Sequence, residues 1–229
     1  MVMKSAFVTV LSLASRCAPR GPTCSADADA DPQRLASAVD SIVDGCREWI
    51  REHVIRLGLC PFASQPFVAE QIRYAVTDAT TNEELVEEFF VEGRLLLDTP
   101  SEELATTMLI APDFRASIDD FFDLYEWLTA FLEDEGEELL ENKVQPAFFH
   151  PQWNFDGLTA DSPIHFEKRA PMPVINLLRR ADLDSVVEQG LANGRVVNRD
   201  IAEHNAAALE AEGFDALTRA FLQYGKHLK

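Results

Sequence analysis

Three strand-like segments separated by two helix-like segments constrain the fold of this chain more than any other feature. Residues 70–76 alternate apolar and polar side chains, which predicts a strand with one solvated face. Residues 107–111 form a continuous apolar run, typical of a central strand buried on both faces. Residues 144–149 form the third segment, and Pro146 favours an edge position because proline cannot donate a ladder hydrogen bond. Because crossover connections are right-handed, we expect three parallel strands with Met108–Ala111 in the middle.

This order predicts an α/β protein with a small, mainly parallel three-stranded sheet, and α+β is the alternative. Helical periodicity predicts a long N-terminal helix from Arg34 to Gly58, where the glycine provides a C-terminal cap. Thr80-x-x-Glu83 has the form of a capping box for the first crossover helix, and Asp113 precedes the second. A C-terminal helical region is expected at about residues 173–180, 183–189, 201–212 and 215–227.

The first 31 residues differ in composition from the rest of the chain. Lys4, Arg16 and Arg20 occur there, Ser and Ala are frequent, and no Asp or Glu precedes Asp27. This composition is typical of an organelle transit peptide. We therefore expect residues 1–31 to be a targeting leader and disordered junction, for a plastid or mitochondrion rather than the secretory route. Residues 32–229 are expected to form a single globular domain.

The net charge restricts the partners of this protein. The chain has 39 acidic and 20 basic side chains, a formal charge of −19. Phosphate backbones and anionic lipids bind clusters of Lys and Arg, so we expect no nucleic acid partner. The apolar segment at residues 6–14 is too short to cross a bilayer, so no membrane insertion is expected. Four cysteines without a disulfide framework or zinc spacing predict reduced thiols.

His150 is the strongest candidate for a catalytic residue. It directly follows the third strand, at the carboxyl edge where open α/β sheets usually bind ligands. An imidazole titrates near neutral pH and can act as acid or base. The alternative is a structural role in which the ring bonds a backbone carbonyl and holds the loop through Pro151.

Basic residues gather in one short window of this acidic chain: Lys168, Arg169, Arg179 and Arg180. Such a cluster favours an anion site, with Arg169 holding a carboxylate or phosphate through two parallel hydrogen bonds. The amino end of the helix expected from Pro173 would assist. The alternative is local ion pairing with Glu167, Asp182 and Asp184.

Three motifs occur in order along the chain, with Asn205 further on: Leu57-Gly-Leu-Cys-Pro-Phe-Ala63, Phe148-Phe-His-Pro-Gln-Trp-Asn-Phe155 and Arg169-Ala-Pro-Met-Pro-Val-Ile-Asn-Leu-Leu-Arg179. They resemble the DUF1415 family of bacterial and plant proteins. Its corresponding segments look like Leu-Cys-Pro-Phe-Ala, Ser-Phe-His-Pro-x-Tyr-x-Phe and Asn-Arg-Ser-Pro-Tyr-Pro-x-x-His-Leu-Leu-Arg-Glu. The likeness covers about residues 40 to 215, and it implies membership without implying an activity.

The chain departs from that family pattern at five positions. The pattern has Asn, Ser, Tyr, His and Glu where this chain has Lys168, Ala170, Met172, Asn176 and Arg180. Several side chains able to exchange protons or donate hydrogen bonds are therefore absent. We expect either a changed ligand or a lost chemistry, and we count Lys168 and Asn176 among the candidate substrate-binding residues.

Cys60 and Asp161 are weaker candidates. Cys60 follows a helix carboxyl end, whose dipole raises a thiol pKa, so a small apolar role is favoured unless the fold brings a cation close. Asp161 could join His150, His165 and Asp156 in a divalent metal site, but their spacing matches no known metal motif, and we predict no cofactor. The chain has no glycine-rich phosphate loop and no Gly-x-Ser-x-Gly elbow, which argues against standard nucleotide binding and serine hydrolysis.

Two functions follow from these residues. The preferred one is a small organellar enzyme or metabolite-binding protein for an anionic compound, in which Arg169 holds the anion and His150 exchanges a proton. The alternative is a non-catalytic interaction or assembly protein that keeps the fold. Such a protein would bind a protein partner through its acidic surface or its long first helix.

Overall fold

The computed structural model describes residues 32–114, 117–134, 140, 143–192, 196–224 and 226. The chain divides into two compact units, Met1–Ser37 and Ala38–Lys229. Of the first unit only residues 32–37 are described, and they form the first turns of helix α2 (Pro32–Trp49). The predicted leader, residues 1–31, lies outside the described residues.

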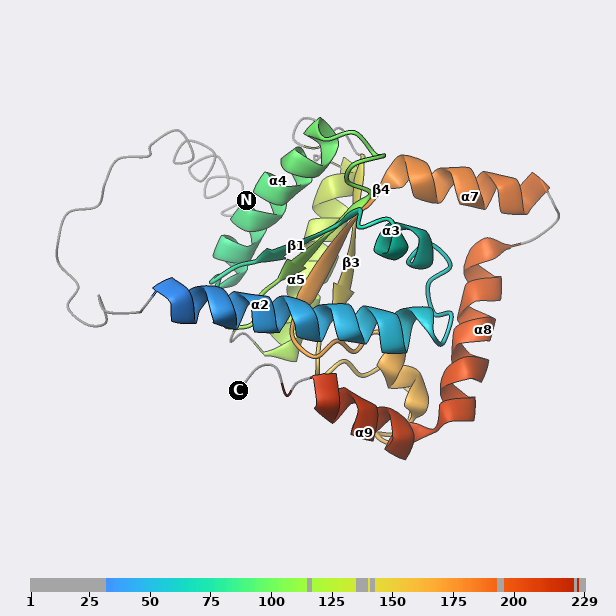
Figure 1. The fold of residues 1–229 in the computed structure, drawn as a ribbon. Coiled ribbons are helices and arrows are strands. Elements are labelled where there is room, and N and C mark those ends of the chain that lie inside the picture. Colours follow the sequence, from blue (N-terminus) through green and yellow to red (C-terminus); the bar gives the residue numbers. More distant parts are fainter. Residues whose placement is uncertain are drawn as a thin grey trace. The chain divides into compact units, whose positions relative to one another are not determined.

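A four-stranded mixed sheet forms the centre of the second unit (Figure 1). Its strands are β1 (Ile72–Val76), β2 (Thr106–Ile110), β3 (Val144–Phe149) and β4 (Val174–Arg179), in the order β1-β2-β4-β3. β1 and β2 are parallel, and β4 is antiparallel to both β2 and β3. The α/β class and the three predicted strands, which share one direction, are confirmed. The edge position of β3, which contains Pro146, is confirmed as well.

The prediction of a helix at residues 173–180 is wrong, because this segment contains strand β4. Val174, Ile175 and Leu177 are almost completely buried, as expected for a strand covered on both faces. Pro171 and Pro173 resemble a helix start, but the β-branched pair that follows favours extended backbone. As a result the sheet has four strands and is mixed, and no helix amino end lies next to Arg169.

One face of the sheet is covered by α2 and by the π-helical segment η1 (Ile50–Ile55) that continues it (Figure 1). Trp49 packs edge-on against Phe149 at the end of β3, with ring centroids 5.3 Å apart. Met108 of β2 and Val174 of β4 belong to the same buried cluster. Since side chains alternate along a strand, the even-numbered residues of β2 and β4 face α2.

The other face is covered by α4 (Asn82–Asp98) and α5 (Ile118–Asp134) (Figure 1). Phe121 and Tyr125 of α5 each lie 5.2 Å, ring centroid to ring centroid, from Phe148 of β3. Arg73 of β1 forms a two-pronged ion pair with Glu92 of α4, with N–O distances of 2.7 and 2.9 Å. The core therefore has two halves, one on each side of the sheet.

Reciprocal caps start both of these helices, although at other residues than predicted. At α4, the Glu84 amide donates to the Thr81 hydroxyl at 3.3 Å, and the Glu84 carboxylate accepts the Thr80 amide at 2.8 Å. At α5, Ser117 and Asp120 each bond the other's amide at 3.1 Å. The predicted box at Thr80 is thus one residue early, and α5 begins with a cap at Ser117, four residues after Asp113.

Helices α7 (Arg180–Ala192), α8 (Val197–Glu212) and α9 (Phe214–Tyr224) complete the chain and confirm the other predicted C-terminal helices. α8 and α9 pack around the 3-10 helix η2 (Pro163–Glu167), with Leu209, Leu217 and Phe166 in one buried cluster. The short helix α3 (Ser64–Val68) precedes β1. Within the described part of the chain, no helix combines the length and the apolar character that crossing a membrane requires.

Candidate functional site

A pocket of about 570 Å³ lies on the α2 face of the sheet. Its walls are mainly apolar and come from α2, η1 and all four strands, including Trp49, Ile50, Val54, Ile72, Met108 and Phe149. Three polar residues lie among them: Cys60, Thr106 and Asn176. Exposed polar side chains, among them Gln65, Glu102 and Asp182, complete the lining. An apolar cavity with a few converging polar groups is the usual form of a small-molecule site.

The end of the first helix shapes one wall of this pocket. At the end of η1 the Arg56 amide bonds the Arg51 carbonyl, five residues earlier, at 3.1 Å, and in the turn that follows the Leu59 amide bonds the Val54 carbonyl at 2.9 Å. The chain then turns at Gly58, whose φ of +68° confirms the predicted glycine cap. Helices with this wider turn are often found at functional sites. Here Cys60, two residues after the turn at Gly58, lies in the lining of the pocket.

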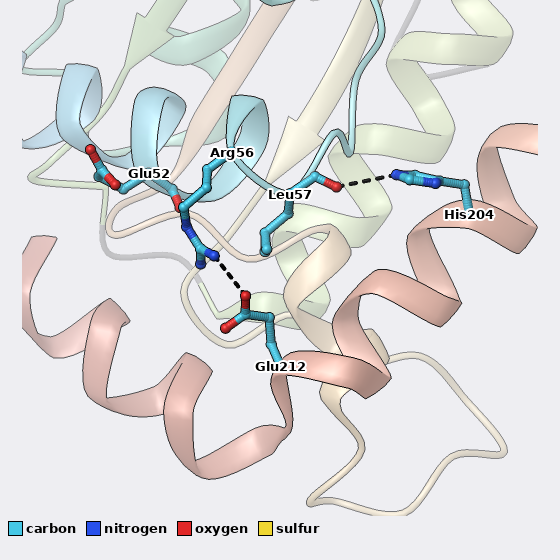
Figure 2. A network of polar contacts seen from close by, with 5 residues as sticks. All are labelled: Glu52, Arg56, Leu57, His204 and Glu212. Carbon is cyan, nitrogen blue, oxygen red and sulfur yellow. Dashed lines mark hydrogen bonds and ion pairs between the residues drawn. The ribbon is translucent and has the colours of Figure 1, made fainter.

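Helix α8 holds this turn in place (Figure 2). His204 donates a hydrogen bond from Nε2 to the Leu57 carbonyl at 3.2 Å, and Arg56 pairs with Glu212 at 2.6 Å. A Cβ atom added at Gly58 would lie only 3.0 Å from His204 Nε2, so the two segments approach closely. The position of Cys60 therefore depends on a residue 144 positions away along the chain, which local sequence patterns do not predict.

Opposing effects act on the pKa of the Cys60 thiol. Burial raises its pKa, while the backbone amides of Phe62 and Ala63 and the charge of Lys168 act in the opposite direction. The fold therefore does bring a cation close to Cys60, but burial dominates. The thiol is protonated at neutral pH, which agrees with the tight-turn interpretation of this residue.

Asn176 of β4 lines the pocket, and only one of its two polar atoms has a hydrogen-bond partner among the described residues. The Thr106 hydroxyl lies 2.6 Å from Asn176 Oδ1 and 2.7 Å from the Leu177 carbonyl, and its single proton is shared between these two acceptors. The Asn176 amide nitrogen has no hydrogen-bond partner among the described residues. It is therefore available to donate to a ligand.

The side chain of Lys168 lies next to one wall of the pocket. Its Nζ lies 5.1 Å from the ring centroid of Phe149, a pocket wall residue. No hydrogen bond or ion pair links this ammonium to any described residue. Burial lowers the Lys168 pKa, and the neighbouring Glu167 and Cys60 only partly oppose this. The Glu167 carboxylate accepts a hydrogen bond from Asn205 Nδ2 at 2.9 Å.

His150 follows β3 as predicted, but its ring lies against α5. It is 5% exposed, its ring centroid lies 5.2 Å from that of Phe121, and Nδ1 accepts the Gln152 amide at 3.2 Å. Its own amide donates to the Lys168 carbonyl at 3.0 Å. Burial lowers the His150 pKa to about 4. These contacts match the structural alternative for His150, with a backbone amide as the ring's partner.

Arg169 also bonds the loop that follows β3. Its Nε donates to the Trp153 carbonyl at 2.9 Å, one terminal nitrogen donates to Asn154 Oδ1 at 2.7 Å, and its guanidinium stacks 4.8 Å from the Phe166 ring centroid. None of these partners is one of the acids considered for local pairing. Arg179, in turn, donates to carbonyl groups at the end of α4. The basic side chains of this window therefore contact different parts of the protein.

The residues considered for a metal site do not converge. His165 accepts the Phe155 amide at Nδ1 and donates from Nε2 to the Thr159 carbonyl. Asp161 is exposed, and hydrogen bonding to Thr159 lowers its pKa. No group of three or more metal-binding side chains lies together in the residues for which the structure gives positions.

The structure thus places Cys60 and Asn176 in the lining of one pocket and Lys168 against its Phe149 wall, and it leaves His150, Arg169 and Asp161 outside. At the carboxyl edge of β1, β2 and β3, the connection from β3 to β4 folds back, and the Ala111 amide bonds the Pro173 carbonyl at 3.0 Å. The pocket instead includes residues at the start of β1 and β2. Sequence patterns missed Trp49 and Thr106 as lining residues, because Trp49 resembles any other member of a helix stripe.

Fold and site together define an α/β protein with a mixed sheet and a pocket between its first helix and one sheet face. Residues 41–219 match the family described as protein of unknown function DUF1415, so the chain belongs to that family. Neither the curated proteins nor the solved structures contain a match to the chain.

Positions at which the chain departs from the family pattern fall near this pocket. Asn176 lines the pocket, and Lys168 lies against its Phe149 wall. Ala170 and Met172 are buried in the same cluster as Trp49.

Proposed function

We propose that this protein binds a small anionic molecule, a carboxylate or phosphate, in the pocket between α2 and the sheet. The observation that carries the proposal is the Lys168 ammonium, which lies beside the pocket wall with no acceptor among the described residues. Lys168 is half-buried, and the partial loss of solvent lowers its pKa, so a bound anion would stabilise its charged form.

The neutral donors of the pocket support the same ligand class. Within the described part of the chain, the Asn176 amide nitrogen has no partner, and neither has the fully buried indole N–H of the lining residue Trp49. The Asn176 Oδ1 acceptor is already occupied, because it accepts the Thr106 hydroxyl. A ligand with acceptor oxygens complements these donors, and an apolar body fits the walls.

The test is a thermal-shift series on the full chain with small carboxylates, inorganic phosphate and neutral amides of the same carboxylates. At a ligand concentration of about 100 times Kd, binding adds about 2.7 kcal/mol. For a domain of this size that raises Tm by roughly 5 to 10 °C. Lys168→Met removes the shift, whereas Lys143→Met, a change at an exposed lysine, retains it. Equal shifts from acid and amide would contradict the proposal.

A catalytic role for His150 and an anion clamp at Arg169 are the competing assignment for the same function. Their hydrogen bonds to backbone atoms support structural roles instead. In the same thermal-shift series, His150→Ala and Arg169→Ala lower the melting temperature but keep the ligand-induced rise. Loss of that rise in either variant, with the fold intact, would favour the competing assignment.

A protein-interaction role is the second candidate. Val91 and Leu95 are 62% and 39% exposed and lie one turn apart on α4, which favours a contact surface there. Size-exclusion chromatography with light scattering on the full chain tests this role. A monomer at all concentrations, unchanged by Val91→Ser with Leu95→Ser, would count against self-association through α4.

The targeting assignment for residues 1–31 is part of the proposal and rests on their composition. Fusing these residues to a fluorescent protein tests it directly in plant cells. Plastid or mitochondrial fluorescence is the expected result, and diffuse fluorescence is the contrary one.

A further inference from the structure

We infer that Lys168 is a nucleophile that forms an imine with a carbonyl compound bound in the pocket, most simply a 2-oxo acid. This inference rests on the proposed anion site, whose ligand it makes more specific. Neither the family match nor the sequence motifs suggest this chemistry. It follows from how the lysine is placed.

The first argument is the absence of an ionic partner. Lysines on protein surfaces remain solvated or pair with acids, whereas Lys168 lies against the Phe149 ring and forms no ion pair with a described residue. Its sequence neighbour Glu167 turns its carboxylate to Asn205, whose amide also bonds the Leu59 carbonyl at 3.1 Å. The acid nearest in sequence is therefore held by other donors.

The second argument concerns the protonation state. An amine attacks a carbonyl only when it is unprotonated, and an ordinary lysine is almost fully protonated at neutral pH. Burial lowers the Lys168 pKa, which increases the reactive fraction. The neighbouring Cys60 thiol has a raised pKa, so it remains protonated and does not compete as a thiolate.

The third argument concerns the reaction and its protons. The neutral Lys168 nitrogen adds to the carbonyl carbon and gives a carbinolamine. The C–O bond then breaks, and the oxygen leaves as water with the two protons of the amine. The product is an imine, and no oxidant or reductant is needed. The ring of Phe149, 5.1 Å from Lys168 Nζ, gives the new C=N bond an apolar neighbour on one side.

The fourth argument identifies the acid group on the ligand. Protonation of the imine nitrogen keeps one positive charge at the position of the ammonium, so a carboxylate on the adjacent carbon stays paired before and after the reaction. The free Asn176 amide donates from the same pocket. A simple aldehyde would react without this pairing and bind more weakly.

The experiment traps the imine by reduction in the full chain. The protein is incubated with pyruvate or glyoxylate and sodium cyanoborohydride, and the modified lysine is located by peptide mass spectrometry. The chain has only five lysines, so each can be followed separately. We expect labelling of Lys168 at least tenfold faster than of the exposed Lys143, with suppression by lactate, which has the carboxylate but no ketone.

Two controls keep the outcomes distinct. Lys168→Arg preserves the charge, so it retains a carboxylate-induced rise in Tm while losing the rapid label. Equal labelling of Lys168 and Lys143 in the parent protein overturns the imine inference, and this result does not depend on any variant folding. If, in addition, carboxylates do not raise Tm, both the imine inference and the proposed anion-binding function are refuted. If they do raise Tm, the anion site stands without the covalent chemistry.

Discussion

Replacing Lys168 by methionine is expected to stabilise the ligand-free protein. The methionine has a similar length, keeps the contact with Phe149 and removes an amine that has no partner among the described residues. A fully buried polar group without a partner costs about 1 to 3 kcal/mol in mutational series, and the half-buried Lys168 ammonium is expected to cost about 1 kcal/mol, at the lower end of this range. Removing that cost raises Tm by roughly 2 to 4 °C for each kcal/mol in a domain of this size.

The pH dependence separates this mechanism from better packing. Because burial lowers the Lys168 pKa in the folded state, the unfolded chain binds more protons as the pH approaches the ordinary lysine value. The parent protein therefore gains stability relative to Lys168→Met as pH rises, and the advantage of the variant disappears near pH 10.5. Each unit of lowered pKa corresponds to about 1.4 kcal/mol.

Urea unfolding of both proteins at several pH values measures this difference. Lys143→Met, at an exposed position of the described chain, is the matched control and is expected to change stability by less than about 0.5 kcal/mol. A Lys168→Met protein less stable than the parent at pH 7 would refute the reasoning. A stability gain that is independent of pH would attribute the effect to packing.

Two further predictions concern the frame around the pocket. His53 and His150 both have a pKa of about 4 in the folded state because of burial, against 6.5 in the unfolded chain, so the stability they provide above pH 6.5 is lost as pH falls toward 4. The loss is at most about 3 kcal/mol for each ring, and urea unfolding at pH 7 and 4.5 should show a smaller difference in His53→Gln than in the parent. Gly58→Ala should destabilise the fold by about 1 to 2 kcal/mol, because its φ of +68° is strained for alanine and His204 must also move. Gly157→Ala, with φ +79° and no atom within 4 Å of the added Cβ, should cost less in thermal melts, and an equal cost would remove the His204 contact from the explanation.

Local patterns predicted most of the fold because each relied on neighbouring residues. Helical periodicity located α2, and alternation located β1. A fully apolar run located β2, whose five residues are all buried. Strand β4 was missed because it is also apolar on both faces, so it lacks alternation, and the two prolines before it resemble a helix start. β4 lies between β2 and β3 because it pairs with residues far away in the sequence, and local patterns do not predict such pairing.

The candidate site could be predicted only in part for the same reason. Residue type and motif singled out Cys60, Lys168 and Asn176 as candidates, but the position of Asn176 in the pocket lining depends on β4 being a strand. Along a strand Asn176 faces α2, whereas along a helix it would have faced elsewhere. His150 was correctly located at a strand end, yet which face its ring takes is decided by packing against Phe121.

The most direct measurement is nuclear magnetic resonance of the full chain with its lysines labelled by reductive ¹³C-methylation, with Lys168→Arg identifying the Lys168 signal. The account predicts a signal that titrates below the other lysines and that moves when a small carboxylate is added, while the signal of Lys143 does not move. A Lys168 signal that titrates with the exposed lysines and ignores carboxylates would contradict the account.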